Sequence, residues 1–355
     1  MSDLFKNMLK GGESVFLNEL ALDYDYLPPI IKYRENQQKR IAECIQPLFQ
    51  GRAGRNLIII GSPGIGKTAA VRAVIRELES KTDDILCVYL NCWKKDSEFK
   101  LLCDLCEQIG YTWTHNKRVD ELVKVAAEIL NKKAVVLVFD EADKLEEQGI
   151  LYTLLEDIQR KSFILITNDL EFLATIDSRV RSRMTPELLE FKPYTLLEVE
   201  GILKQRIEYA FVPQVWDSSY IQTLAKKTFD LADLRSGLYL LRESGLLAEA
   251  SSVRRIAEKH VQEAVMKLSD FKEKAVRLLD DEEKNILDLI KSNSGAETKD
   301  LFEVYKKGGG EKGYRTFQRK IRDLLENKFI SAKEVNTGSG VGRTRILDYI
   351  SENED

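Results

Sequence analysis

The chain has 355 residues, with 54 Lys and Arg against 58 Asp and Glu, and 43% of its residues are hydrophobic. This composition is typical of a globular protein of two or three domains. No run of 18 apolar residues occurs and no signal peptide is recognisable, so we expect a cytoplasmic protein with no membrane partner. Because the net charge is −4, any binding to nucleic acid must come from a local basic patch.

The five cysteines lie in largely apolar stretches, which is typical of reduced thiols in a cytosolic protein. Cys103 and Cys106 are spaced C-x-x-C within a helical pattern and have no second pair beside them. Two buried thiols are the favoured interpretation, and a metal or redox site is the alternative.

A phosphate-binding loop is predicted after the first strand. Residues 20–35 lead into a helix with Ile41 and Ile45 on its apolar side, and a buried strand follows at 56–60. The strand continues into Gly61-Ser-Pro-Gly-Ile-Gly-Lys-Thr68, which matches G-x-x-x-x-G-K-T and opens a helix. Glycines let backbone N–H groups surround phosphate oxygens, and the helix N-terminus adds positive charge.

In such a loop the lysine contacts the β- and γ-phosphates and the threonine hydroxyl holds Mg²⁺. Lys67 and Thr68 are expected in these roles, and residues 20–35 are well placed to cover the adenine. The residues expected to bind the nucleotide here are Gly64, Ile65, Gly66, Lys67, Thr68, Ala69 and Ala70.

Two further strands end in polar side chains that suit nucleotide hydrolysis. After a strand at 85–91 and two helical stretches within 97–130, the strand at 134–140 ends in Asp140 and Glu141. We expect Asp140 to hold the Mg²⁺ shell and Glu141 to polarise the attacking water; an exposed acidic turn is the alternative.

A helix at 150–158 leads to a strand at 162–168 that ends in Asn168. Its amide can hydrogen-bond both the γ-phosphate and the lytic water, although an ordinary turn at the strand end is also open. Buried strands alternating with helices predict an α/β fold with a parallel sheet.

Basic residues and helices dominate the next part of the chain. Arg179 and Arg183 precede a strand at 188–191, and a guanidinium there suits phosphate neutralisation across a subunit boundary; a solvated basic face is the alternative. From 194 to about 268 the pattern is helical, with Arg235 on the first turn of one helix, where surface charge is the simpler interpretation.

The C-terminal part has the pattern of a winged helix. An acidic hinge at 280–283 precedes helices at 283–291, at 298–305 with Thr298 as N-cap, and at 314–327, and then a hairpin with a glycine-rich tip. Residues 312–345 contain nine Lys or Arg against three Asp or Glu, which favours phosphate binding over the alternative, a protein contact. The candidate DNA contacts are Arg315, Gln318, Arg319, Arg322 and, on the wing, Arg343.

The order of these motifs resembles that of the archaeal ORC-type replication initiators, which are AAA+ ATPases, over residues 20–350. The marks of the resemblance are Leu27-Pro28, Tyr33-Arg34-Glu35, Thr167-Asn168-Asp169-Leu170, Arg179-Val-Arg-Ser-Arg183, Phe191-Lys-Pro-Tyr194-Thr195 and Ile202-Leu203-x-x-Arg206. It implies an AAA+ P-loop core over 1–193, an all-helical lid over 194–270 and a winged-helix DNA-binding domain over 275–355.

The resemblance also implies residue roles. Asn168 matches sensor 1 and Arg235 matches sensor 2. Arg183, in preference to Arg179, matches the finger that acts on a neighbour's ATP, and Tyr194 and Arg206 match positions that close on the nucleotide. Two departures stand out: the family's Gly-Asp-Ala-Arg is Ala-Asp-Leu-Arg at 232–235, and the segment 143–161 has room for about one helix, which puts DNA contact by the ATPase domain in doubt.

The function implied is a slow Mg-ATP hydrolysing initiator that binds double-stranded origin DNA and helps recruit or load the replicative helicase. Assembly with a second copy or a paralogue would involve Arg183. The alternative is an ATP-gated DNA-binding regulator that does not act at origins.

Overall fold

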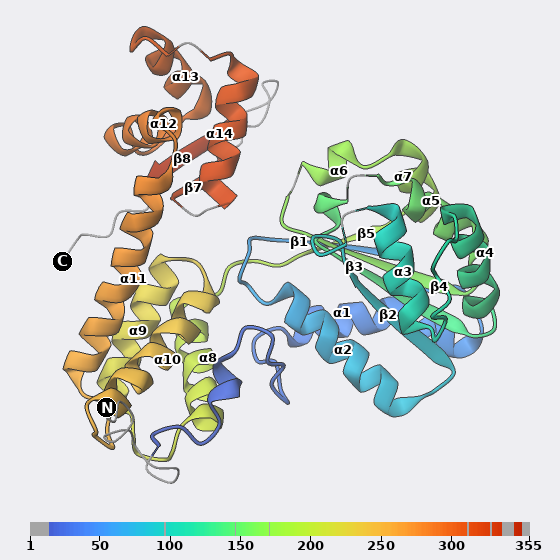
Figure 1. Ribbon diagram of the computed structural model, residues 1–355, viewed down its shortest axis with the longest axis horizontal. Helices are drawn as coiled ribbons and strands as arrows, with labels where there is room; N and C mark the ends of the chain where they lie inside the picture. The colour runs from blue at the N-terminus through green and yellow to red at the C-terminus, as the bar shows by residue number, and fades with distance from the viewer. Residues whose placement is uncertain are drawn as a thin grey trace, which may run out of the picture. The chain divides into compact units, whose positions relative to one another are not determined.

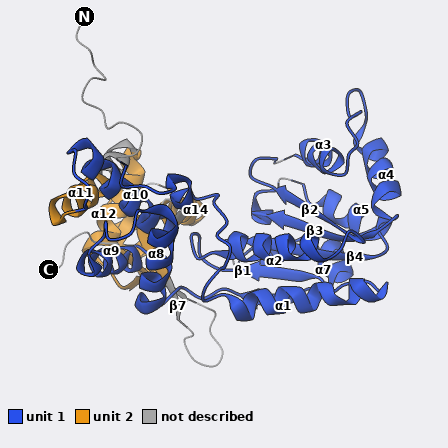
Figure 2. Cartoon of the chain, turned by 90° about the horizontal axis from the view of Figure 1, so that it is seen from below, with its two compact units in different colours: residues 1–256 blue, residues 257–355 orange. Residues whose placement is uncertain are grey.

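The computed structural model describes residues 14–95, 97–145, 147–169, 171–310, 312–326, 329–335 and 344–349. The chain divides into two compact units, residues 1–256 and residues 257–355, which Figure 2 shows in different colours. Arg343, the glycine-rich tip of the predicted hairpin and Leu170 lie outside the described residues.

The first unit is built on a five-stranded parallel sheet, as predicted. Its strands are β1 (Leu57–Ile60), β2 (Ile85–Asn91), β3 (Ala134–Asp140), β4 (Lys161–Thr167) and β5 (Glu187–Glu190). They are ordered β2-β3-β4-β1-β5, and every neighbouring pair is parallel. The pairing of Ile60 with Thr167 and of Asn91 with Asp140 brings the carboxyl ends of the strands to one edge, where the polar residues follow.

Helices cover both faces of this sheet (Figure 1). Those of the core are α1 (Glu35–Ile45), η2 (Gln46–Gln50), α2 (Lys67–Lys81), α3 (Glu98–Gln108), α4 (Val119–Leu130), η3 (Ala142–Lys144), α5 (Gly149–Asp157), α6 (Phe172–Thr175) and α7 (Ser178–Met184). The short helix η1 (Glu19–Leu22) precedes the core and packs on two of the three helices that complete the unit. Apolar residues of α3, α4, α5 and α7 pack with strand residues such as Val88, Leu137 and Phe163 in one buried cluster. Helices α1 and α2 lie together on the other side (Figure 1). This layered arrangement holds the polar strand ends in place.

Three helices complete the first unit: α8 (Leu196–Ala210), α9 (Ser218–Asp230) and α10 (Leu234–Ala250). Thr195 begins α8 with a capping box, in which its side chain accepts from the Glu198 N–H and the Glu198 carboxylate accepts from the Thr195 N–H. The N-terminal segment joins these helices through the bridge between Phe16 and Phe211. The segment before the core is thus packed against the helical part of the unit.

The second unit has the arrangement of a winged helix. It contains α11 (Glu258–Leu278), α12 (Asp281–Ser292), β6 (Ala296–Glu297), α13 (Thr298–Lys307), α14 (Tyr314–Glu326), β7 (Ile330–Val335) and β8 (Thr344–Tyr349). The three strands form an antiparallel sheet in the order β6-β8-β7. Ile286, Leu301, Phe317 and Leu347 share its core. The unit has a hydrophobic core of its own.

Three details of this unit differ from the sequence predictions. The residues taken for an acidic hinge start a helix, because Asp280 and Glu283 form a capping box on α12. Thr298 is the first residue of α13 and not its N-cap, which is Glu297. Strand β6 was not anticipated, since two residues are too short for any periodicity to show.

Three findings bear on other classes of function. None of the helices in the described part of the chain combines the length and the apolar character needed to cross a bilayer. Cys106 is buried in α3, where burial raises the pKa of its thiol to about 11, and Cys103 is half-buried and free. Among the described residues no group of three or more His, Cys, Asp and Glu side chains could hold a metal ion. The cysteine pair is thus a pair of thiols on one helix.

Candidate nucleotide-binding and catalytic site

The loop between β1 and α2 needs glycine at two positions where other parts of the unit approach it. Gly64 and Gly66 have φ of 76° and 86°, a region that L side chains rarely adopt. A Cβ on Gly64 would lie 1.9 Å from Asp233 Oδ1, and one on Gly66 would lie 2.7 Å from the Tyr194 hydroxyl. These glycines give the loop its shape and also make room for the lid and for Tyr194.

Lys67 lies at the centre of the site and is 6% exposed. Its ammonium group donates to the carbonyls of Gly61 (2.7 Å) and Ser62 (2.8 Å) and to Asn168 Oδ1 (2.6 Å). Burial lowers its pKa to about 8, partly offset by the carboxylate of Asp140. Because Asn168 Oδ1 faces Lys67, its Nδ2 points the other way, and within the described part of the chain it meets no acceptor, so it can donate to a phosphate oxygen or a water. The structure therefore brings the predicted lysine and asparagine into direct contact.

Thr68 and Asp140 also meet, as predicted. The Thr68 hydroxyl donates to Asp140 Oδ2 over 2.7 Å, and the hydroxyl of Tyr89 on β2 donates to the same oxygen. A hydroxyl and a carboxylate side by side are the oxygen ligands that suit Mg²⁺, which keeps several waters and phosphate oxygens in its shell. This pair therefore fits Mg²⁺ bound with a nucleotide. Tyr89 was missed, since nothing in an apolar strand marks one tyrosine as a partner of an acid.

Glu141 is held in a left-handed conformation with φ of 54°, at the junction of β3 and η3. Its N–H donates to Asp140 Oδ1 over 2.9 Å. Burial raises the pKa of its carboxyl, and the nearby charges of Asp140 and Asp143 add to the effect. Asp143 is in turn held by the Thr167 hydroxyl at 2.8 Å. A carboxyl with a raised pKa next to Asp140 is suited to accept a proton from water.

The start of α10 brings the lid against the loop. The Leu234 N–H donates to the Gly64 carbonyl over 3.3 Å, and Asp233 caps α10 by accepting from the Arg235 N–H. Arg235 lines the same pocket as Lys67 and Glu141. Ala232, which replaces the family's glycine, has φ of 48° and is exposed. The replacement of the family's glycine by alanine at position 232 thus lies where the backbone would be unstrained with glycine.

Arg34 connects the loop to the junction between core and lid, although the sequence marked it only as part of a family motif. It is 4% exposed, and its guanidinium donates twice to the Ile65 carbonyl (3.2 and 3.0 Å) and once to that of Lys192 (2.8 Å). It also lies over the ring of Tyr194, 3.8 Å from its centre. Arg34 therefore holds both the loop backbone and Tyr194 in place.

One pocket of the first unit contains most of the residues predicted for the nucleotide site. It is lined by Tyr24, Pro28, Ile31, Lys32, Gly64, Gly66, Lys67, Thr68, Ala69, Asp140, Glu141, Asn168, Tyr194, Ile202, Gln205, Arg206, Leu234, Arg235 and Leu238. Ile65 and Ala70 are buried and do not line this pocket: the Ile65 carbonyl accepts from Arg34, and the Ala70 N–H donates to the Gly66 carbonyl within the start of α2. Residues 24–32 line one side of it, where the sequence placed the cover of the base.

Arg206 has a contact that the sequence did not predict. Its guanidinium donates to the carbonyls of Ala21 (3.0 Å) and Tyr26 (3.4 Å) and lies over the ring of Tyr26. It is 9% exposed. Arg206 therefore lines the pocket and also fixes the N-terminal segment that forms one of its walls.

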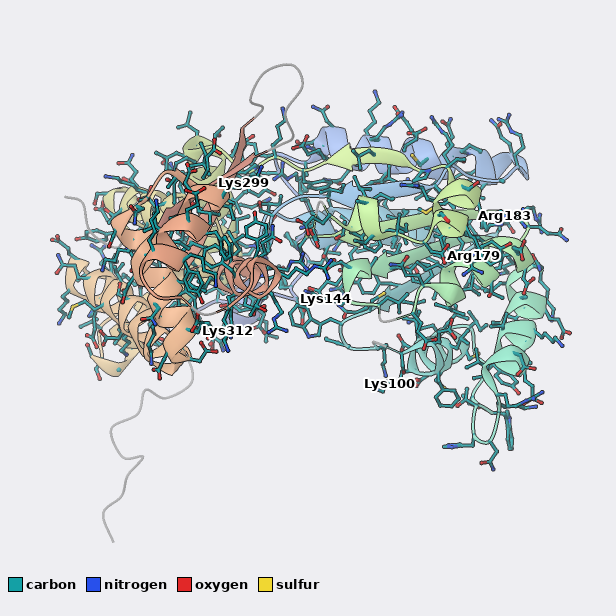
Figure 3. All side chains as sticks on the ribbon, turned by 90° about the horizontal axis from the view of Figure 1, so that it is seen from above. Lys100, Lys144, Arg179, Arg183, Lys299 and Lys312 are labelled. Atoms are coloured by element: carbon teal, nitrogen blue, oxygen red, sulfur yellow. The ribbon has the colours of Figure 1, made fainter. Side chains whose placement is uncertain are left out.

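Arg179 and Arg183 lie outside this pocket, on the exposed surface of α7 (Figure 3). Arg179 pairs with Asp177 at 2.8 Å, and Arg183 pairs with Glu156 of α5. Both guanidinium groups approach the ring of Tyr152, at 5.3 and 5.9 Å. Neither side chain lines the chain's own nucleotide site, and action on a neighbouring molecule stays a prediction for both.

On the second unit, the predicted DNA-contact residues of α14 lie on one exposed face: Arg315, Gln318, Arg319 and Arg322. Lys299 and Lys312 also lie at the surface of this unit (Figure 3). Lys320, which contributed to the counted basic excess, instead bonds Asp280 (2.5 Å) and Glu283 (2.8 Å). The charge of Lys320 is therefore used within the fold.

Comparison with known proteins shows which protein family has this arrangement of a nucleotide-binding core and a lid. Residues 51–173 match the model of an AAA domain, and residues 200–266 match that of a Cdc6 AAA+ ATPase-type lid domain. ORC1-type DNA replication protein 2 of Methanothermobacter thermautotrophicus is 30% identical over 96% of this chain and 94% of its own length. The chain belongs to the ORC1-type DNA replication proteins.

Another member, ORC1-type DNA replication protein 1 of Sulfurisphaera tokodaii, is 30% identical over 96% of this chain and 91% of its own length. The Aeropyrum pernix ORC1 protein, solved in complex with DNA, has a TM-score of 0.68 at 27% identity and covers 95% of this chain and 94% of its own. The Aeropyrum pernix ORC2 protein, solved in ADPNP-ADP complexes, has a TM-score of 0.73 at 19% identity, covering 94% of each chain. The resemblance inferred from the motifs is confirmed.

Proposed function

We propose that this ORC1-type protein is an ATP-hydrolysing replication initiator that binds double-stranded origin DNA and helps recruit or load the replicative helicase. The observation that carries the proposal is that Lys67, Asp140, Glu141, Asn168 and Arg235 all line one pocket. The pocket holds each group that hydrolysis of a nucleoside triphosphate requires.

Each residue would have a distinct part in the reaction. Lys67 and the loop N–H groups bind the phosphates, and Thr68 and Asp140 hold Mg²⁺, which neutralises charge on the transferred phosphoryl group. Glu141 takes the proton from the attacking water, and Asn168 orients that water against the γ-phosphate.

The lid would report the state of the nucleotide. Arg235 reaches the pocket from α10, which is hydrogen-bonded to the loop through Leu234 and Gly64. A γ-phosphate attracts Arg235 and its loss releases it, so ATP and ADP stabilise the two lid positions unequally. Such a difference allows ATP to control assembly, in which Arg183 would leave Glu156 and act on a neighbour's nucleotide.

DNA binding is assigned to the exposed face of α14. We expect Arg319 and Arg322 to contact phosphates, so Arg319→Ala with Arg322→Ala should weaken binding to any duplex and reduce the salt dependence by about 0.9 per lost contact. Titration of labelled duplex DNA at several salt concentrations, with Mg-ATP and then with ADP, measures both effects. Lys226→Ala, an exposed change on α9, is the control. Unchanged binding by the double variant would overturn the assignment.

The second candidate function is an ATP-gated regulator that binds DNA away from origins. It has support from the region between Asp143 and Lys161, where the described residues form η3 and the single helix α5. Footprinting on the host genome separates the two: protection of repeats beside the origin supports the initiator, and protection confined to promoters supports the regulator.

A further inference from the structure

The pocket has a second part, beyond the residues expected to contact phosphates, whose ligand group can be inferred from its lining. Most of its side chains are apolar or aromatic: Tyr24, Pro28, Ile31, Ile202 and Leu238. Such a lining suits the flat faces of a nucleobase but does not tell one base from another. Selection between bases requires a polar group that meets the base edge.

Gln205, on α8, is a polar side chain in this part of the pocket and is 4% exposed. Its Nε2 donates to the Ile30 carbonyl over 3.2 Å and lies 3.4 Å from the Tyr209 hydroxyl. Because a backbone carbonyl only accepts hydrogen bonds, the Ile30 carbonyl fixes which end of the amide faces it. Oε1 must therefore face the other way.

Oε1 has no hydrogen-bond donor among the residues that the structure describes. In that part of the chain, the side-chain polar atoms that are sealed from solvent without a partner are Trp216 Nε1 and His260 Nε2. Oε1 is therefore in contact with solvent. Because Gln205 is otherwise buried and lines the pocket, Oε1 meets solvent inside the pocket. Lys32 and Arg206 also line the pocket, but neither donates to Oε1 in the part of the chain that the structure describes. When a ligand displaces the water from this fixed acceptor, the ligand must supply a donor in its place.

We propose that Gln205 Oε1 accepts a hydrogen bond from the exocyclic amino group of adenine and so selects ATP over GTP. This inference rests on the proposed binding of a nucleoside triphosphate. Adenine carries a donor at position 6, whereas guanine carries an oxygen there, which would bring two acceptors together. A site built to bond a ligand donor discriminates strongly against a ligand that lacks it.

The test measures Kd of the full chain for ATP, GTP and purine riboside triphosphate, which lacks the amino group. We expect the unaltered chain to bind ATP about 10-fold more tightly than GTP and about 5-fold more tightly than the purine analogue. In Gln205→Met, which keeps the length of the side chain, ATP and the analogue should bind within about 2-fold of each other. The analogue tests the contact in the unaltered chain, so the result does not depend on the variant's folding.

Gln38→Met is the matched control, because Gln38 Nε2 donates to the next carbonyl, that of Ile31, at 3.1 Å and does not line the pocket. We expect it to leave all three Kd ratios unchanged. Equal binding of ATP and the analogue by the unaltered chain would overturn the inference, and so would the same loss of selectivity in both variants. Failure of the unaltered chain to bind any of the three triphosphates would instead overturn the proposed function.

Discussion

Replacing Ala232 by glycine should stabilise the first unit, contrary to the usual effect of glycine. Ala232 has φ of 48° and lies between α9 and the start of α10. The left-handed conformation costs an L-residue roughly 1–2 kcal/mol, because Cβ approaches the following carbonyl oxygen. Glycine avoids that strain but loses about 0.5–1 kcal/mol more conformational entropy on folding. Since the Ala232 methyl group is exposed and loses little packing, the free energy of unfolding should rise by about 0.5–1 kcal/mol.

Denaturant unfolding followed by tryptophan fluorescence measures this change. All three tryptophans of the chain, Trp93, Trp113 and Trp216, lie in the first unit, so the signal follows that unit. Ala42→Gly is the matched control: Ala42 is exposed within α1, and glycine there should lower the free energy of unfolding by about 1 kcal/mol. If Ala232→Gly destabilises the unit as Ala42→Gly does, the reasoning from backbone strain is refuted.

Three other changes follow from contacts in the structure. Arg34→Ala leaves the carbonyls of Ile65 and Lys192 without their side-chain donor, so the free energy of unfolding of the first unit should fall by about 3 kcal/mol. ATP should also bind more weakly, and denaturant unfolding and titration calorimetry measure the two effects. Unaltered ATP affinity would contradict the role of Arg34 in holding the loop. Tyr89→Phe removes the hydrogen bond that the Tyr89 hydroxyl donates to Asp140, so the carboxylate is held less firmly. The Mg²⁺ concentration at half-maximal ATP hydrolysis should therefore rise about 3-fold or more. An unchanged Mg²⁺ dependence would show that the tyrosine has a purely structural role. The hydrogen bond from Lys320, followed by those from the backbone N–H groups of Glu283 and Glu282, lowers the pKa of Asp280. Asp280 therefore stabilises the second unit above about pH 4, and this stabilisation is lost as the pH falls through the lowered pKa. Lys320→Met should reduce that pH dependence of unfolding and leave the part due to the backbone, whereas a variant with the same acid transition as the parent would contradict the role of Lys320.

The sheet and the phosphate site could be predicted because their signals are local. Short apolar runs ending in Asp140 or Asn168 show both the strand and the edge at which it ends, and the spacing of Lys67 and Thr68 fixes them on the first turn of α2. Parallel strands then bring these ends together without further information.

What could not be predicted depends on contacts between distant segments. Arg34, Tyr89 and Gln205 meet their partners across 31 or more residues of sequence, and a buried arginine or glutamine has the same local pattern as an exposed one. The acidic run at 280–283 was ambiguous for another reason, because a charged stretch suits a hinge and a helix start equally well. Only the capping geometry of Asp280 and Glu283 separates the two.

The central claim is that the pocket around Lys67 hydrolyses ATP with Glu141 as the group that activates water. Steady-state hydrolysis and ATP affinity of Glu141→Gln test it most directly, because glutamine keeps the size of the side chain but cannot accept the proton. We expect Glu141→Gln to bind ATP as tightly as the parent does, while turnover falls by about 10²–10⁴-fold. Turnover equal to that of the parent would contradict it.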